Sequence, residues 1–163
     1  MTSLFGKRPQ VRVAPGERVL AWTEAAGGEL LAGTREALYL DGARVAWEDV
    51  EAADWDRDTE AFRVVEVGHW GERRPEHRFV IAEPRRFLEL VRERVTASVV
   101  LVRHAPVVGR RGVRVIARRA PSGGGELSWI YEYDAGIDPD DPTVRLAAEA
   151  TLSRAREEVG LDP

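Results

Sequence analysis

Short segments of alternating polarity, each ended by a turn signal, fill the chain from Glu17 to Glu83. The longest unbroken apolar runs have four residues, as in Val99–Val102, whereas a membrane-spanning helix needs about 18 or more. Alternation with a period of two over four to eight residues is typical of strands that bury one face. We therefore expect the first half of the chain to be an antiparallel β structure.

Turn residues and apolar spacing place the individual elements. The clearest turn signal is Asp41-Gly42, because a type I′ hairpin turn requires positive φ at both central positions; Gly27-Gly28 gives another hairpin turn. Pro84 suits the first turn of a helix, and an apolar stripe at helical spacing follows it from Leu88. The expected elements are strands over 18–23, 29–33, 36–40, 43–47, 50–55, 62–67 and 78–82, followed by an amphipathic helix from 84.

Seven short strands capped by one helix resemble the bacterial pleckstrin-homology-like (PH-like) domain over residues 17–97. The stretches that carry this resemblance are GERVLAWTEAAGGELLAGTREALYL, RVAWEDVEAADWD, FRVVEV and the helix PRRFLELVRERV. The resemblance implies an α+β, mostly β fold: a strongly bent, seven-stranded sheet or barrel with the helix at one open end. It also implies scaffolding, protein binding or lipid binding rather than catalysis.

The loop between the first two strands departs from the lipid-binding members of that family. Those members concentrate lysine and arginine in this loop, whereas residues 24–29 here contain two glutamates and no base. Acidic side chains repel a phosphate head group. We therefore expect no binding to phosphoinositide membranes. We also expect Trp22, Trp47 and Trp55 to be mostly buried, with at least two of them anchoring the barrel.

The second half of the chain predicts a hairpin and a helix. Residues 112–119 and 127–133 alternate as two strands around the loop PSGGG, and Asp141 and Pro142 supply an N-cap and a first helical position. The valines within 98–104 fit either the end of the first helix or a strand. The expected organisation is an arm over 1–16, a PH-like domain over 17–103 with its capping helix from 84, and a hairpin with a packed C-terminal helix over 104–163.

Charge is strongly segregated in the second half. Residues 94–125 contain seven arginines and no acid, whereas residues 126–163 contain ten acids and three arginines. Such a basic segment can bind an anion, or the adjoining acidic segment can neutralise it within the fold. The residues that could bind an anion or a partner are Arg110, Arg111, Arg114, Arg118 and Arg119, and in a separate loop Trp70, Arg73 and Arg74.

The sequence favours a binding protein over an enzyme. It contains no cysteine, which excludes thiolate metal sites and cysteine nucleophiles, and its three histidines match no metal-ligand spacing. We expect no cofactor, no metal and no catalytic site in a cytoplasmic protein that binds a protein partner or a second copy of itself. The alternative is RNA or anion binding through residues 103–119, because residues 84–159 also fit the helix, three strands and helix of double-stranded RNA-binding domains.

Overall fold

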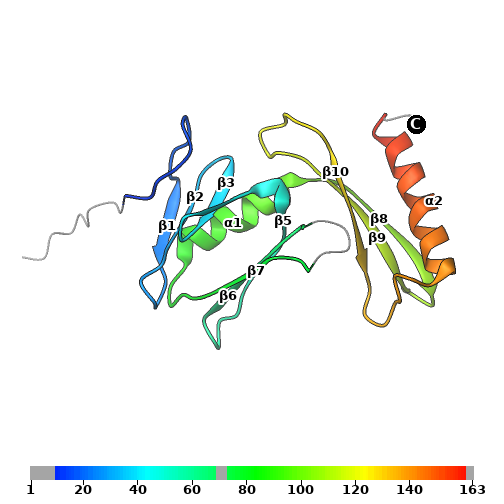
Figure 1. Ribbon diagram of the computed structural model, residues 1–163, viewed down its shortest axis with the longest axis horizontal. Coiled ribbons are helices and arrows are strands. Elements are labelled where there is room, and N and C mark those ends of the chain that lie inside the picture. Colours follow the sequence, from blue (N-terminus) through cyan, green and yellow to red (C-terminus); the bar gives the residue numbers. More distant parts are fainter. Residues whose placement is uncertain (1–9, 69–72, 161–163) are drawn as a thin grey trace, which may run out of the picture. The chain divides into compact units, whose positions relative to one another are not determined.

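The computed structural model describes residues 10–68 and 73–160. Within them the chain is an α+β protein, mostly β, with ten strands in three antiparallel sheets and two α-helices (Figure 1). It divides into two compact units, residues 1–96 and 97–163, whereas the sequence pattern predicts a boundary after residue 103. None of the described helices is both long and apolar enough to cross a membrane.

The first unit holds seven strands in two sheets (Figure 1). The four-stranded sheet has the order β1-β2-β3-β4 and the three-stranded sheet the order β5-β6-β7. Asp41 and Gly42, with φ of 50° and 92°, make the predicted turn between β3 and β4. The strands are β1 Ala21–Glu24, β2 Leu30–Gly33, β3 Ala37–Leu40, β4 Ala43–Ala46, β5 Val50–Trp55, β6 Ala61–Glu66 and β7 Glu76–Val80. A 3-10 turn, Trp47–Asp49, precedes β5. Helix α1, Arg85–Ser98, follows β7.

Both sheets and α1 contribute side chains to the core of the first unit. Trp47, Phe62 and Phe87 are its largest fully buried side chains, and the rings of Phe62 and Phe87 meet edge to face at 5.5 Å. The Trp47 indole nitrogen donates a hydrogen bond to the Thr34 carbonyl at 2.9 Å, which satisfies the one polar atom of that buried ring. A Cβ at Gly33 would lie 2.6 Å from Leu90 Cδ2, so glycine there permits the close approach of α1 to the sheet.

Residues 11–19 cover the outer face of the four-stranded sheet. Val11, Val13 and Val19 pack against a second, smaller apolar cluster that contains Ala32 and Tyr39. Both faces of β3 are therefore buried, where alternation alone predicts one. The part of the expected N-terminal arm that the structure describes is thus packed on the sheet.

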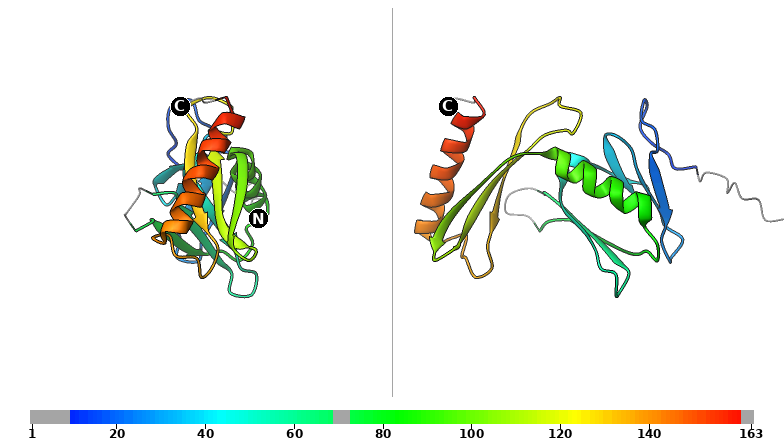
Figure 2. Two further views of the ribbon diagram at one scale, coloured as in Figure 1. Left: turned by 90° about the vertical axis from the view of Figure 1, so that its right-hand side faces the viewer. Right: turned by 180° about the vertical axis from the view of Figure 1, so that it is seen from behind.

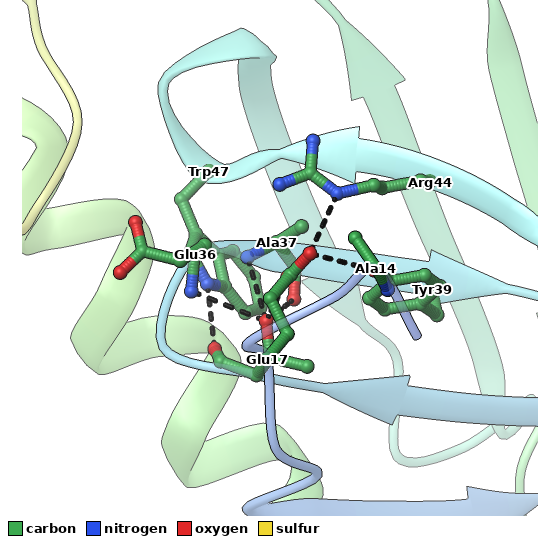
Figure 3. A network of polar contacts seen from close by, with 8 residues as sticks. Ala14, Glu17, Glu36, Ala37, Tyr39, Arg44 and Trp47 are labelled. Carbon is green, nitrogen blue, oxygen red and sulfur yellow. Dashed lines mark hydrogen bonds and ion pairs between the residues drawn. The ribbon is translucent and has the colours of Figure 1, made fainter. Parts of the chain in front are cut away.

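Glu17 fastens this covering segment to the sheet (Figure 3). Its carboxylate accepts hydrogen bonds from the Thr34 hydroxyl at 2.6 Å, the Tyr39 hydroxyl at 2.9 Å and the Arg44 guanidinium at 3.1 Å. Burial raises the pKa of Glu17, but these three donors outweigh burial and hold the pKa below its ordinary value of 4.5. The Ala14 amide also donates to the Tyr39 hydroxyl, at 2.8 Å.

The second unit is a three-stranded antiparallel sheet with a helix on one face (Figure 2). Its elements are β8 Val99–Val108, β9 Arg111–Arg118, β10 Ser128–Tyr133 and α2 Pro142–Glu158, in the sheet order β10-β9-β8. Helix α2 buries Val144, Ala148, Thr151 and Ala155 and contacts β8 and β9. Asp141 is its N-cap, as predicted, and accepts hydrogen bonds from the amides of Thr143 and Val144.

Two expectations need correction, and one open alternative is decided. The seven strands of the first unit form two separate sheets, and no closed barrel occurs in the described residues. The expected hairpin is present as β9 and β10, and residues 99–108 form β8 rather than a continuation of α1, which adds a third strand to it. Trp47 is fully buried and Trp55 packs against the core, but Trp22 is 42% exposed, since its side chain alternates away from the core face that Ala21 occupies.

Candidate functional site

An open hollow of about 530 Å³ lies in the first unit where β7 leads into α1. Three segments form it: the end of β5 and the following turn, the connection from β7, and the first two turns of α1. The residues that line it are Trp55, Arg57, Glu60, Ala82, Glu83, Pro84, Arg85, Leu88, Glu89 and Arg92.

Local hydrogen bonds fix the turn that carries one wall of the hollow. The Asp56 carboxylate accepts from the amides of Asp58 at 2.8 Å and Thr59 at 3.2 Å, as aspartate does in Asx turns. Glu60 then adopts a φ of 59°, which reverses the chain into β6. The Trp55 indole nitrogen donates to the Ile81 carbonyl at 3.0 Å, and this bond ties the end of β5 to the chain that enters α1.

The hollow joins apolar side chains to a rim of mixed charge. Pro84 and Leu88 are buried in the fold, and Trp55 is half-buried. The rim carries three arginines, Arg57, Arg85 and Arg92, and three glutamates, Glu60, Glu83 and Glu89. Arg85 and Glu83 pair at 3.1 Å.

Two arginines of the rim are available for an external charge. Arg57 and Arg92 are both exposed, and among the described residues neither forms an ion pair with an acid. Each arginine presents five N–H donors in a planar fork. The hollow therefore combines apolar and charged side chains, and Arg57 and Arg92 can each donate hydrogen bonds to an acidic group of a ligand.

The arginines proposed from the sequence do not converge on one anion-sized patch. Arg114 donates to Asp134 at 2.7 Å, and Glu132, its cross-strand neighbour, lies 3.9 Å away. Arg118 is 5% exposed and donates to the Ser98 hydroxyl at 2.9 Å. Arg110 and Arg111 are exposed at the β8–β9 turn, whereas Arg119 is half-buried beyond the other end of β9.

Asp134 is the acidic centre beside the basic strand. The Gly112 amide donates to it at 2.8 Å and the His104 ring lies 3.0 Å away. The Gly112 hydrogen bond, followed by those of His104 and Arg114, lowers the pKa of Asp134 to about 2. This carboxylate is therefore charged at neutral pH, and the basic segment is partly neutralised inside its own unit.

The second predicted cluster is only partly described by the structure. Trp70 lies outside the described residues. Arg74 pairs with Glu51 on β5, whose side chain is 9% exposed. Arg73 is exposed and forms no ion pair with a described residue. This loop therefore offers one free guanidinium in the part that the structure describes.

Sequence reasoning missed the hollow. Arg85, Glu89 and Arg92 follow one another at helical spacing, a pattern that ordinarily marks a solvated face. The turn around Arg57 lies almost thirty residues earlier in the chain, and only the fold joins it to α1. The detectable signal was Glu83-Pro84-Arg85 at a helix start that follows a strand.

Comparisons with known proteins add no assignment to this geometry. The chain matches no family model, and searches of the curated proteins and of the solved structures return no match. Within the described residues, no group of three or more histidines and acids is arranged to hold a metal ion.

Proposed function

We propose that residues 17–97 are a PH-like binding module that takes a protein partner in the hollow at the start of α1. The order of four strands, three strands and a helix supports the PH-like assignment. The observation that carries the binding proposal is the hollow itself, in which Trp55 and Leu88 lie within a balanced rim of arginines and glutamates.

In this proposal the partner places an apolar side chain in the hollow against the half-buried Trp55. An aromatic ring inside a charged rim is the arrangement in which a few contacts carry most of a protein–protein binding energy. Arg57 and Arg92 contribute ion pairs at the edge, where such pairs affect specificity and association rate more than affinity. A protein surface supplies both kinds of contact.

Lipid and nucleic-acid binding have less support. A phosphoinositide head group or an RNA backbone requires an excess of positive charge, and the rim carries as many glutamates as arginines. The β1–β2 loop adds two glutamates and no base. In the second unit, Arg103 pairs with Glu158 and Arg114 with Asp134, and acids precede α2 where double-stranded RNA-binding domains need bases.

Affinity capture with charge-reversed variants tests the proposal. The tagged full-length protein is expressed in its native cells as wild type, as Arg57→Glu/Arg92→Glu, and as Arg86→Glu. Arg86 is an exposed arginine of the same helix that does not line the hollow, so it is the matched control. Half of each sample receives nuclease.

We expect proteins that survive nuclease treatment to be retained by wild type and Arg86→Glu and reduced at least tenfold by the double variant. Equal retention by all three forms would contradict the proposal. Loss of every retained protein on nuclease treatment would favour the nucleic-acid alternative.

A further inference from the structure

A groove of about 470 Å³ lies in the second unit between the edge strand β8 and helix α2. One wall consists of four consecutive residues of β8, Arg103 to Pro106, and the other of α2 residues Ala147, Thr151, Arg154 and Glu158. None of these residues lines the hollow of the first unit. We propose that this groove binds an extended acidic peptide segment, which pairs as an additional strand with the outer edge of β8.

The outer edge of β8 is open to another strand. Within the described residues β8 is last in the order β10-β9-β8, so one of its edges pairs with β9 and the other with no strand. Its pairing register is continuous from Leu101 to Pro106 and shifts on either side of that stretch. On its outer edge this stretch pairs with no described strand, and the Val102 carbonyl accepts a 2.8 Å hydrogen bond from the Arg103 guanidinium. An unpaired edge of this kind is a template for strand addition.

Side chains along β8 suit an extended occupant. Val100, Val102 and Val108 are 40%, 43% and 56% exposed. Successive residues of a strand point to opposite faces. A peptide that pairs with β8 can therefore cover exposed valines with alternate side chains while its other side chains face the charged groups of α2.

Charge in the groove selects an acidic occupant. Arg103 and Glu158 form an ion pair with each other, and this contact raises the pKa of Arg103 and lowers the pKa of Glu158. Arg154 is exposed and has no acidic partner among the described residues, and its Nε donates a 3.4 Å hydrogen bond to the Ala150 carbonyl. Because Arg103 and Glu158 neutralise each other, the residues that line the groove carry one net positive charge, that of Arg154.

The same charges disfavour a second copy of this chain as the occupant. A two-fold axis between two antiparallel strands sets a residue opposite the same residue of the other copy. Pairing of two copies centred on Arg103 would therefore place two Arg103 side chains opposite each other, which is destabilising. Pro106 lacks an amide donor, so it ends the stretch with which any added strand can pair.

Binding of synthetic peptides to the full-length protein tests this inference. The probe is a fluorescein-labelled ten-residue peptide of alternating Glu and Val, measured by fluorescence anisotropy. One comparison peptide has Lys in place of Glu, and another has the Glu/Val sequence with N-methyl groups on alternate residues, which removes backbone donors. The protein variants are Arg154→Glu and the matched control Arg156→Glu, an exposed arginine of α2 outside the groove.

We expect the Glu/Val peptide to bind wild type and Arg156→Glu alike, and Arg154→Glu at least tenfold more weakly. The Lys/Val and N-methylated peptides should bind at least tenfold more weakly than the Glu/Val peptide. The bound peptide should also slow amide exchange within Leu101–Ala105.

Three results would overturn the inference: no measurable binding of the Glu/Val peptide, equal binding of the N-methylated peptide, or equal binding by Arg154→Glu. Concentration-dependent dimerisation that Arg154→Glu abolishes would instead assign the groove to a second copy. None of these results bears on capture by the hollow, which Arg57→Glu/Arg92→Glu tests separately.

Discussion

Replacing Arg118 with serine tests whether the basic strand is structural. Arg118 is 5% exposed and bound to the fully buried Ser98, so truncation removes two buried methylene groups, worth about 1.6 kcal/mol. It also removes a hydrogen bond worth about 1 kcal/mol and leaves part of the guanidinium volume unfilled. We expect a loss of about 3 kcal/mol in the free energy of unfolding, near the upper end for single substitutions.

Two further variants show how much of this loss of stability comes from the buried apolar stem of Arg118 and how an exposed arginine of the same strand compares. Arg118→Met keeps the apolar stem, so it should lose clearly less stability than Arg118→Ser. Arg114→Ser removes a side chain that is 40% exposed. Ion pairs with this exposure contribute at most about 1 kcal/mol to the free energy of unfolding, so this variant should lose little stability. Urea unfolding followed by circular dichroism, together with amide exchange in β9, measures all three.

A loss below about 1 kcal/mol in Arg118→Ser would refute the structural interpretation of this arginine. So would a stable Arg118→Ser protein that has lost its native partner. Either result would return Arg118 to the set of candidate binding residues.

The remaining predictions concern the β8–β9 pairing, the covering segment and membranes. A Cβ at Gly112 would lie 1.9 Å from the Ala105 backbone oxygen, so Gly112→Ala should lower the free energy of unfolding in urea by about 3 kcal/mol. Gly124→Ala is the control, because a Cβ there meets nothing within 4 Å, and it should leave stability unchanged. Equal stability of the two variants would contradict the pairing of β8 with β9. Because the folded pKa of Glu17 is lowered, its stabilisation is present above pH 4.5 and is lost as pH falls through the folded pKa. Glu17→Gln should therefore be about 1–2 kcal/mol less stable at pH 7, and the deficit should shrink in acid; a constant deficit would exclude the charge as its cause. Phosphoinositide liposomes at low salt should not sediment the protein, and salt-sensitive sedimentation would overturn the argument from the loop over residues 24–29.

Local signals predicted much of the fold. Asp41-Gly42 makes its turn because few other dipeptides adopt positive φ at both positions at low cost. Asp141 caps α2 because its carboxylate reaches two free amides. These features depend on a few neighbouring residues, so the sequence alone specifies them.

Features that depend on tertiary contacts could not be predicted in the same way. The valines of 99–102 fit the helical stripe of α1 and a strand equally well, and pairing with β9 decides for the strand. Alternation predicts one buried face for β3, but Val11 and Val13 cover the other from far along the chain. The hollow joins the turn at Arg57 to the start of α1, and no local pattern links them.

The most direct measurement of the central claim is photo-crosslinking in native cells. A benzophenone amino acid replaces Arg57 on the rim of the hollow or, as the control, Arg35, an exposed residue of the same unit outside the hollow. We predict a discrete adduct at position 57 that protease removes and nuclease leaves intact, and none at position 35. No adduct at 57, equal adducts at both positions or a nuclease-sensitive adduct would contradict protein binding at the hollow.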